Sequence, residues 1–277
     1  MEVQVETIKP AIGAVVRCDK EAFLTEEFAE RCLELLEQHT ALVFPQLGLT
    51  DEEQLAFTDM LGDRVNFTGT VPGGDEAAQD VYTITLDKNV NTEPEYVLGS
   101  MFWHADGICS DIPPPKATLL SCFNPPNKGG QTEFCSTYAA WEALPEEEKA
   151  ELEGLRVMHS VTAAVREVLP PDQINPSRRY MRHEHPLVWT HRNGRKSLLL
   201  GCHADYVIGM PLAQSRALLA RLHEWAAQPD FSCRHTWQKG DFAIWDNTGA
   251  LHRALPYSDD SGRRMHRTTV AGYEEIA

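Results

Sequence analysis

Short apolar runs, each bounded by turn-forming residues, recur along the chain and constrain its fold more than any other feature. The run Ala41-Leu42-Val43-Phe44, which ends at Pro45, is typical of a buried strand. Further strands are predicted within 3–17 and at 81–85, 116–123, 131–135, 156–161, 186–190, 196–201, 233–237, 242–245 and 265–270. Many short strands separated by turns favour a β-sandwich or barrel core.

A few helices are predicted outside this core. Thr25 is suited to cap a helix that runs to about Gln38. The segment from Thr50 to Glu53 resembles a capping box and opens a helix that ends near Gly62. More helices are predicted at 136–144, at 145–155 and from 211 to about 225. Because no internal repeat or linker interrupts this pattern, residues 1–277 are expected to form one domain.

Turn residues predict how some of the strands connect. Asn193-Gly194 is a hairpin signal between 186–190 and 196–201. The turn at Lys239-Gly240 predicts a second hairpin between 233–237 and 242–245. Residues 63–80 are rich in Gly, Asp and Thr and are predicted to form a loop, and 163–184 are expected to form a surface excursion or lid.

The charge of the chain narrows its possible partners. Lys and Arg number 25 against 41 Asp and Glu, which gives a net charge of −16. This excess of acid argues against a nucleic-acid or anionic-membrane partner, which would favour a basic surface. No apolar run reaches the roughly 18 residues of a membrane span. A few buried arginines would still suffice to bind a small anionic substrate.

The cysteines indicate a reducing compartment. They number 7 and include no C-x-x-C pair, which is typical of free thiols and not of a disulfide framework or a zinc site. Each is expected to be a small buried apolar residue. The first ten residues carry Glu2 and Glu6 and no apolar signal segment. The protein is therefore expected in the cytoplasm.

His104 and Asp106 are the first candidate metal ligands. Side chains two residues apart on an extended strand point to the same face, so an imidazole and a carboxylate at this spacing can bind one ion. A second histidine would complete the two-histidine, one-carboxylate set that leaves open positions on ferrous iron. His252, expected in a loop just past a strand, is a candidate. His-x-Asp pairs also occur by chance, so the spacing alone leaves this open.

Arg263 and Arg267 follow on the last predicted strand. They are four residues apart with Met265 between them, so all three would share one face. Two guanidinium groups aimed at one face suit carboxylate binding. The alternative is a pair of solvated charges on an edge strand.

Several motifs together resemble one enzyme family, the Fe(II)/2-oxoglutarate-dependent dioxygenases of the TauD/TfdA type. They are Ile12-Gly13-Ala14, Trp103-His104 with Asp106, the segment from Gly129 to Cys135, Ile244 to Asn247, His252, and Arg263 to Thr268. One departure is Gln131, which stands where the family often has Asp. The resemblance implies an α+β fold with a double-stranded β-helix, or jelly-roll, core and flanking helices. It also implies a homo-oligomer.

The resemblance assigns roles to individual residues. His104, Asp106 and His252 would bind Fe(II), while Arg263 and Thr132 would bind the distal carboxylate of 2-oxoglutarate. Arg267 would lie near the anion of the substrate or cosubstrate. The implied reaction consumes O2, hydroxylates a substrate, and releases succinate and CO2.

The closer likeness is to the branch that oxidises 2,4-dichlorophenoxyacetate. It is carried by Gly130 to Cys135, Glu151 to Arg156, and Gly201 to Pro211. The implied substrate is a small organic anion, a carboxylate or sulfonate, with an aryloxyalkanoate favoured; hydroxylation beside its ether oxygen would yield a phenol and glyoxylate. The candidate substrate contacts are Asn66, Phe67, His203 and Arg267.

Several alternatives stand beside this hypothesis. His203 and Asp205 form a second His-x-Asp pair that also precedes His252. The chain could be a catalytically inactive relative that binds a small molecule, or a zinc hydrolase, although no cysteine cluster near the motif supports zinc. His183 and His185 are spaced like ligands, but solvent exposure is the preferred interpretation of both.

Overall fold

The computed structural model describes residues 3–65, 81–91, 94–110, 113–174 and 176–276. Its largest element is a seven-stranded sheet in the order β1-β2-β3-β13-β5-β15-β4. The β2–β3 pair is parallel and the other pairs are antiparallel. The strands are β1 (Gln4–Lys9), β2 (Ile12–Arg17), β3 (Ala41–Phe44), β13 (Phe242–Asp246), β5 (Ala117–Asn124), β15 (Arg264–Val270) and β4 (Tyr82–Ile84).

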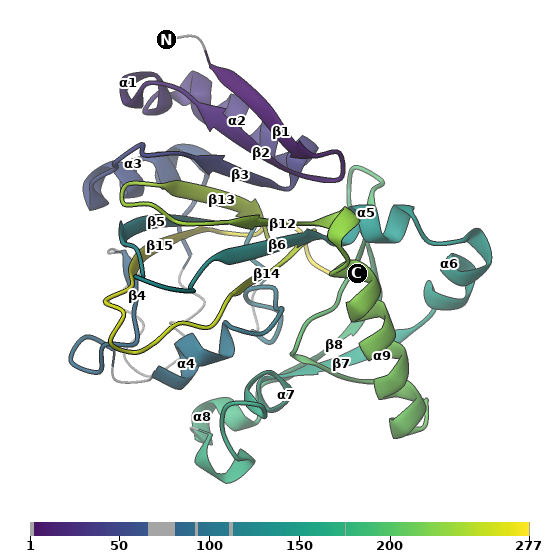
Figure 1. Cartoon of the computed structure of the whole chain (residues 1–277). Coiled ribbons are helices and arrows are strands. Elements are labelled where there is room, and N and C mark those ends of the chain that lie inside the picture. The colour runs from purple at the N-terminus through teal and green to yellow at the C-terminus, as the bar shows by residue number, and fades with distance from the viewer. Residues whose placement is uncertain (1–2, 66–80, 92–93, 111–112, 175, 277) are drawn as a thin grey trace.

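A second sheet lies against one face of the first (Figure 1). It has the order β12-β6-β14, with β12 (Ser232–His235), β6 (Thr132–Ser136) and β14 (Ala250–Ala254). The two sheets share one apolar cluster, in which Phe134 and Ala250 from the small sheet meet Leu120, Trp245 and Met265 from the large sheet. Facing sheets with an apolar layer between them form the predicted jelly-roll core.

Helices cover the outer face of the large sheet (Figure 1). They are α1 (Lys20–Phe23), α2 (Glu26–His39) and α3 (Asp51–Leu61). The Thr25 hydroxyl accepts a hydrogen bond from the Phe28 amide, and Thr50 and Glu53 form a capping box, as the sequence predicts. Phe23 stacks on Phe57 at a ring-centroid distance of 3.9 Å, within an aromatic cluster that buries this face.

The rest of the chain packs beside the sheets around its own apolar cluster. The helices here are α5 (Thr137–Glu142), α6 (Glu146–Leu152), α7 (Val161–Val165), α8 (Pro176–Arg179) and α9 (Leu212–Ala226), with the short turns η3 (Pro171–Gln173) and η4 (Pro229–Phe231). The strands are β7 (Arg156–Ser160), β8 (Arg182–Pro186), β11 (Ala204–Val207) and the pair β9 (Val188–Thr190) and β10 (Lys196–Leu198). None of the described helices is long and apolar enough to cross a bilayer.

One expectation about local structure was wrong, and two segments contain helices that were not predicted. The strands at 233–237 and 242–245 do not form a hairpin: β12 pairs with β6, while β13 pairs with both β3 and β5. Because β13 has a hydrogen-bonded neighbour on each edge, β12 has no place beside it. The 163–184 segment is partly helical, since α7, η3 and α8 lie in or overlap it. A helix that was not predicted, α4 (Pro94–Gly99), precedes the His-x-Asp pair.

Candidate metal and cosubstrate site

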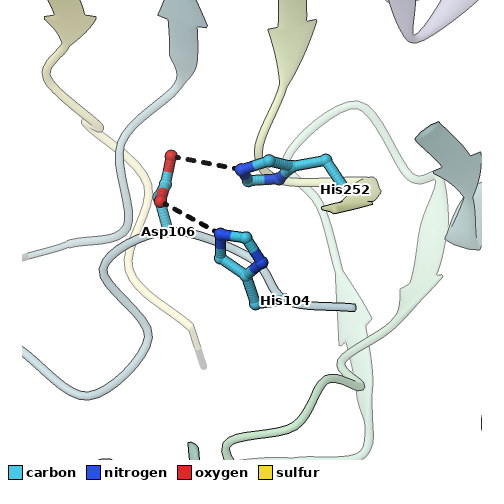
Figure 2. Close-up of side chains that lie close together, drawn as sticks. All are labelled: His104, Asp106 and His252. Carbon is cyan, nitrogen blue, oxygen red and sulfur yellow. Dashed lines mark ion pairs between the residues drawn. The ribbon is translucent and has the colours of Figure 1, made fainter. Parts of the chain in front are cut away.

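Three side chains from two distant segments of the chain, His104 with Asp106 and His252, lie close together (Figure 2). The His104 backbone pairs with the His252 backbone in an isolated antiparallel bridge, with N–H···O distances of 3.1 and 2.9 Å. Asp106 lies two residues beyond His104. One ligand atom from each of the three residues lies within 4.8 Å of the other two.

The separations within this group suit a shared ion better than direct bonds. His104 Nε2 is 3.9 Å from Asp106 Oδ1, and His252 Nε2 is 3.7 Å from Asp106 Oδ2. Both distances exceed those of hydrogen bonds. Two imidazole nitrogens and one carboxylate form the donor set that non-haem ferrous iron uses, so these residues fit that metal.

His252 does not lie in a loop, as the sequence suggested, but in the middle of β14. It is paired with Phe134 of β6, and this strand register fixes the position of His252 in the small sheet. The His104 ring is oriented by its Nδ1, which lies 2.8 Å from the Phe102 carbonyl oxygen. Because a carbonyl can only accept, Nδ1 carries the proton and Nε2 keeps its lone pair for a metal.

A chain of hydrogen bonds holds the Asp106 carboxylate. Thr118 of β5 donates to Asp106 Oδ2 at 2.8 Å, and Asn247 Nδ2 donates to the Thr118 hydroxyl at 2.7 Å. Trp245 Nε1 in turn donates to Asn247 Oδ1 at 3.1 Å. Sequence analysis missed Thr118, because nothing in the segment around it marks a β5 hydroxyl as the partner of a carboxylate.

Charge around Asp106 keeps it ionised. Burial by itself raises the pKa of the carboxyl, but His252, Arg267, His104 and the Thr118 hydrogen bond together hold the pKa below its ordinary value. An ionised carboxylate is the form that binds a metal.

Arg263 and Thr132 form a second polar site. Arg263 is only 3% exposed, and among the described residues the groups that act on its charge are Tyr257 and Cys122, with no carboxylate. Its Nε donates to the Gly130 carbonyl at 3.3 Å, and its guanidinium lies 4.8 Å from the Tyr257 ring centroid. Thr132 is buried nearby on β6, and its oxygen accepts from Trp237 Nε1 at 2.9 Å. A buried guanidinium without a carboxylate suits an anionic ligand.

The Gly129-Gly130 turn makes this site possible. Both glycines have positive φ values, +74° and +66°. A Cβ on Gly129 would lie 2.1 Å from the Pro256 carbonyl oxygen, and one on Gly130 would lie 3.0 Å from Arg263 Cδ. The turn thus brings the start of β6 directly against the arginine.

Arg267 instead lies beside the candidate metal ligands His104, Asp106 and His252, called the metal group below. Its Nη1 is 3.9 Å from Asp106 Oδ1, and its guanidinium lies 4.9 Å from the Tyr82 ring centroid. The alternative of two solvated charges on an edge strand was wrong, because β15 lies between β5 and β4 and Arg263 is buried. The two arginines therefore lie in different surroundings, Arg267 beside Asp106 and Arg263 beside the Gly130 carbonyl.

A cavity of about 170 Å³ opens beside the metal group. His104, Asp106, His203 and Arg267 contribute its polar wall. Much of the rest is apolar, with contributions from Ile108, Cys109, Val161, Ala164, Val165 and Met181. The wall thus includes part of the segment expected to act as a lid.

The other candidate residues lie away from the three-residue group or outside the described residues. Asp205 forms ion pairs with Arg166 at 3.3 Å and Arg216 at 2.9 Å, away from the three-residue group, so the second His-x-Asp pair does not supply its carboxylate. His185 is half-buried and its Nε2 lies 3.0 Å from the Ile108 carbonyl, so its expected exposure was wrong. Asn66 and Phe67 lie outside the described residues.

The fold and the donor set define a class, the jelly-roll oxygenases with a two-histidine, one-carboxylate metal site. Comparison with known proteins identifies the family. The family model "Taurine catabolism dioxygenase TauD, TfdA family" matches residues 4–269. The chain therefore belongs to the TauD/TfdA family, and it is a non-haem Fe(II)- and 2-oxoglutarate-dependent dioxygenase.

Two relatives and one solved structure place the chain within that family. The alpha-ketoglutarate-dependent 2,4-dichlorophenoxyacetate dioxygenase of Burkholderia sp. (strain RASC) is 35% identical over 250 residues, 86% of this chain and 83% of the relative. The (S)-phenoxypropionate/alpha-ketoglutarate-dioxygenase of Sphingobium herbicidovorans is 31% identical over 247 residues, 85% and 83% respectively. The crystal structure of AAD-2 with Mn(II) and N-oxalylglycine, which stand in for Fe(II) and 2-oxoglutarate, matches 100% of both chains with a TM-score of 0.83 and 30% identity.

Proposed function

We propose that His104, Asp106 and His252 bind the iron of this dioxygenase and that its substrate is a small organic anion. The observation that carries the proposal is the meeting of three ligand atoms within 4.8 Å, beside a cavity that Arg267 also lines. When bound, iron supplies the O2 chemistry that couples oxidation of 2-oxoglutarate to succinate and CO2 with hydroxylation of the substrate.

The protein's own residues prepare that chemistry. The Phe102 carbonyl fixes the ring of His104, and Thr118 fixes the carboxylate of Asp106. The apolar cavity wall limits water around the reacting groups. Arg263, with the hydroxyl of Thr132, binds the distal carboxylate of 2-oxoglutarate. The buried guanidinium without an acidic partner supports this assignment.

The substrate is a carboxylate or sulfonate, and an aryloxyalkanoate is favoured. Arg267 would pair with its anionic group near the metal, while the wall from α7, Ile108 and Met181 would contact its apolar body. The names of the two relatives described above, both phenoxyalkanoate dioxygenases, support this choice. Asn66 and Phe67 stay predictions as further contacts.

A screen of small anions tests the substrate class. The purified protein with Fe(II), ascorbate and 2-oxoglutarate is given matched aryloxyalkanoates, alkyl sulfonates and neutral esters of the same acids. We expect the acids to stimulate succinate formation and the esters to leave it at background. An aryloxyacetate should also give a phenol and glyoxylate. Equal stimulation by esters and acids would contradict the anion requirement.

We also propose that the enzyme works in the cytoplasm as a homo-oligomer, with residues 1–277 as one domain. All seven cysteines are free, which suits a reducing compartment. The net charge of −16 continues to argue against nucleic acid and anionic membranes as partners. Light scattering on the eluting protein measures its mass, and a mass of one chain would contradict the oligomer.

The alternative of an inactive family relative has no support, because the donor set is complete.

A further inference from the structure

A buried pair of histidines lies next to the segment that carries His104 and Asp106. His203 occupies the turn before β11, and His159 lies on β7, the neighbouring strand. They are 4% and 0% exposed, and their Nδ1 atoms are 2.8 Å apart. A backbone hydrogen bond from the Ser160 amide to the His203 carbonyl, 2.8 Å long, keeps the two segments together.

The other edge of His203 contacts the metal-binding segment. Its Nε2 is 3.3 Å from the amide nitrogen of Ala105, the residue between His104 and Asp106. An amide N–H can only donate, so His203 Nε2 accepts and carries no proton. In the neutral ring the proton is then on Nδ1, which donates to Nδ1 of His159.

This assignment fixes His159 as well. Since its Nδ1 accepts, its proton is on Nε2, which is buried and has no hydrogen-bond partner among the described residues. Burial, together with the neighbouring His185, lowers the pKa of His159 to about 3, so the ring is neutral near pH 7. Only this arrangement of protons gives both the His203–His159 contact and the Ala105–His203 contact one donor and one acceptor.

The His203 ring packs against Gly201. A Cβ on Gly201 would lie 2.5 Å from His203 Nε2, so the glycine is needed for the ring to sit where it does. The ring lines the cavity, but both of its nitrogens are already used within the protein.

We infer that His203 is a positioning residue: it holds the Ala105 amide, and thereby the spacing of His104 and Asp106, while His159 keeps it in the required tautomer. This inference rests on the proposed metal-binding role of the two flanking residues. It replaces the expectation that His203 binds the substrate anion. Of the described residues that line the cavity, Arg267 is then the one with a permanent positive charge for that anion.

Matched substitutions distinguish a role of His203 in positioning the metal ligands from a role in binding the substrate anion, and Mn(II) is the probe. His203→Phe keeps a ring but removes the acceptor, and His203→Gln offers an amide oxygen near the place of Nε2. We expect His203→Phe to weaken Mn(II) binding by about tenfold, as loss of a group that orients metal ligands does, and Gln to recover most of that loss. The KM for the anionic substrate should change less than the metal affinity in both variants. His39→Gln, at the end of α2 on the other face of the large sheet, is the control.

His159 gives an independent arm, because it is not among the residues that line the cavity. His159→Phe should weaken Mn(II) binding, and His159→Asn, whose amide oxygen can replace the Nδ1 acceptor, should restore it. This arm decides the matter if His203→Phe does not fold, as judged by circular dichroism.

Two results would overturn the inference. One is a large rise in substrate KM for His203→Phe with unchanged Mn(II) affinity, which would make His203 an anion ligand. The other is equal behaviour of the Phe and Gln variants, or of the Phe and Asn variants at position 159. Failure of the metal site itself is distinguished by Asp106→Ala, which must lose Mn(II) binding if the proposed function is correct.

Discussion

At the residue scale, the site depends on polar groups that orient one another across different strands. Asp106, its Thr118 donor and Asn247 come from three separate segments, yet each hydrogen bond between them is 2.8 Å or shorter. Sequence analysis found His104, Asp106 and His252 because the spacing and the family likeness marked them. It could not find Thr118, since a hydroxyl on a buried strand has no local signature.

The Thr118 hydrogen bond should matter for metal affinity. Thr118→Val keeps the shape of the side chain but leaves Asp106 without its donor and Asn247 without its acceptor. We expect metal affinity to fall by about 10- to 100-fold, measured by anaerobic titration with Fe(II) or Mn(II). Thr118→Ser, which keeps the hydroxyl, should stay close to the wild type. Equal affinity in the Val variant would show that the carboxylate needs no such support.

The two arginines should separate kinetically. Arg263→Gln removes a buried charge with no acidic partner, so the KM for 2-oxoglutarate should rise by about 10- to 100-fold, the worth of a hydrogen bond to a charged group. Arg267→Gln should chiefly raise the KM of the anionic substrate. Steady-state kinetics with each reactant varied in turn tests both variants. The assignments are wrong if the two substitutions affect the same KM.

At the element scale, the small sheet has an acidic residue at its centre. Glu133 of β6 lies opposite Arg234 of β12 and Arg253 of β14, with side-chain contacts of 2.6 to 2.9 Å. Burial raises the pKa of Glu133, but the hydrogen bonds and charges of the two arginines outweigh it and hold the pKa below its ordinary value. This triplet ties together the three strands that present His252.

The triplet predicts a pH-dependent stability difference. A carboxyl whose pKa is lowered by folding stabilises the protein above its unfolded pKa, and that stabilisation is lost as the pH falls through the folded value. Glu133→Gln should therefore lower the free energy of unfolding near pH 7. The loss should be only about 1–2 kcal/mol, because Arg234 is largely exposed and solvent weakens its attraction to Glu133. Urea unfolding at several pH values should show this difference shrinking below about pH 4. A constant difference would contradict the ionic origin.

Local signals predicted elements better than they predicted pairing. The caps of α2 and α3 and the turn between β9 and β10 were correct, because each depends on a few adjacent residues. The expected hairpin of β12 and β13 failed because alternation identifies a strand without identifying its neighbour. For the same reason His252 was placed in a loop, although β14 pairs with β6 more than a hundred residues earlier in the chain.

At the scale of the whole molecule, the fold brings the metal group, the Arg263 site and the apolar cavity together. The chain segment that follows β7 supplies one wall of that cavity through α7. The sequence predicted an excursion there but not its helices, since the segment has no apolar period. Single-domain organisation, oligomeric state and the contacts of Asn66 and Phe67 stay predictions.

The α7 wall should control which substrates fit. Ala164→Phe would fill part of a cavity of about 170 Å³. We expect kcat/KM for an aryloxyalkanoate to fall by at least about tenfold, because a pocket discriminates by roughly that factor for small changes in volume. The KM for 2-oxoglutarate should change little. Glu167→Phe, which is exposed and does not line the cavity, is the matched control. The cavity is not the substrate site if both variants behave alike.

The most direct test of the account is the metal stoichiometry of the anaerobically prepared protein. Calorimetric titration with Fe(II) should give one ion per chain for the wild type, and no measurable binding at that site for His104→Ala, Asp106→Ala or His252→Ala. The same three variants should form no succinate in the presence of substrate. One tightly bound ion per chain in all three variants would contradict the central claim, because the metal would then be held elsewhere.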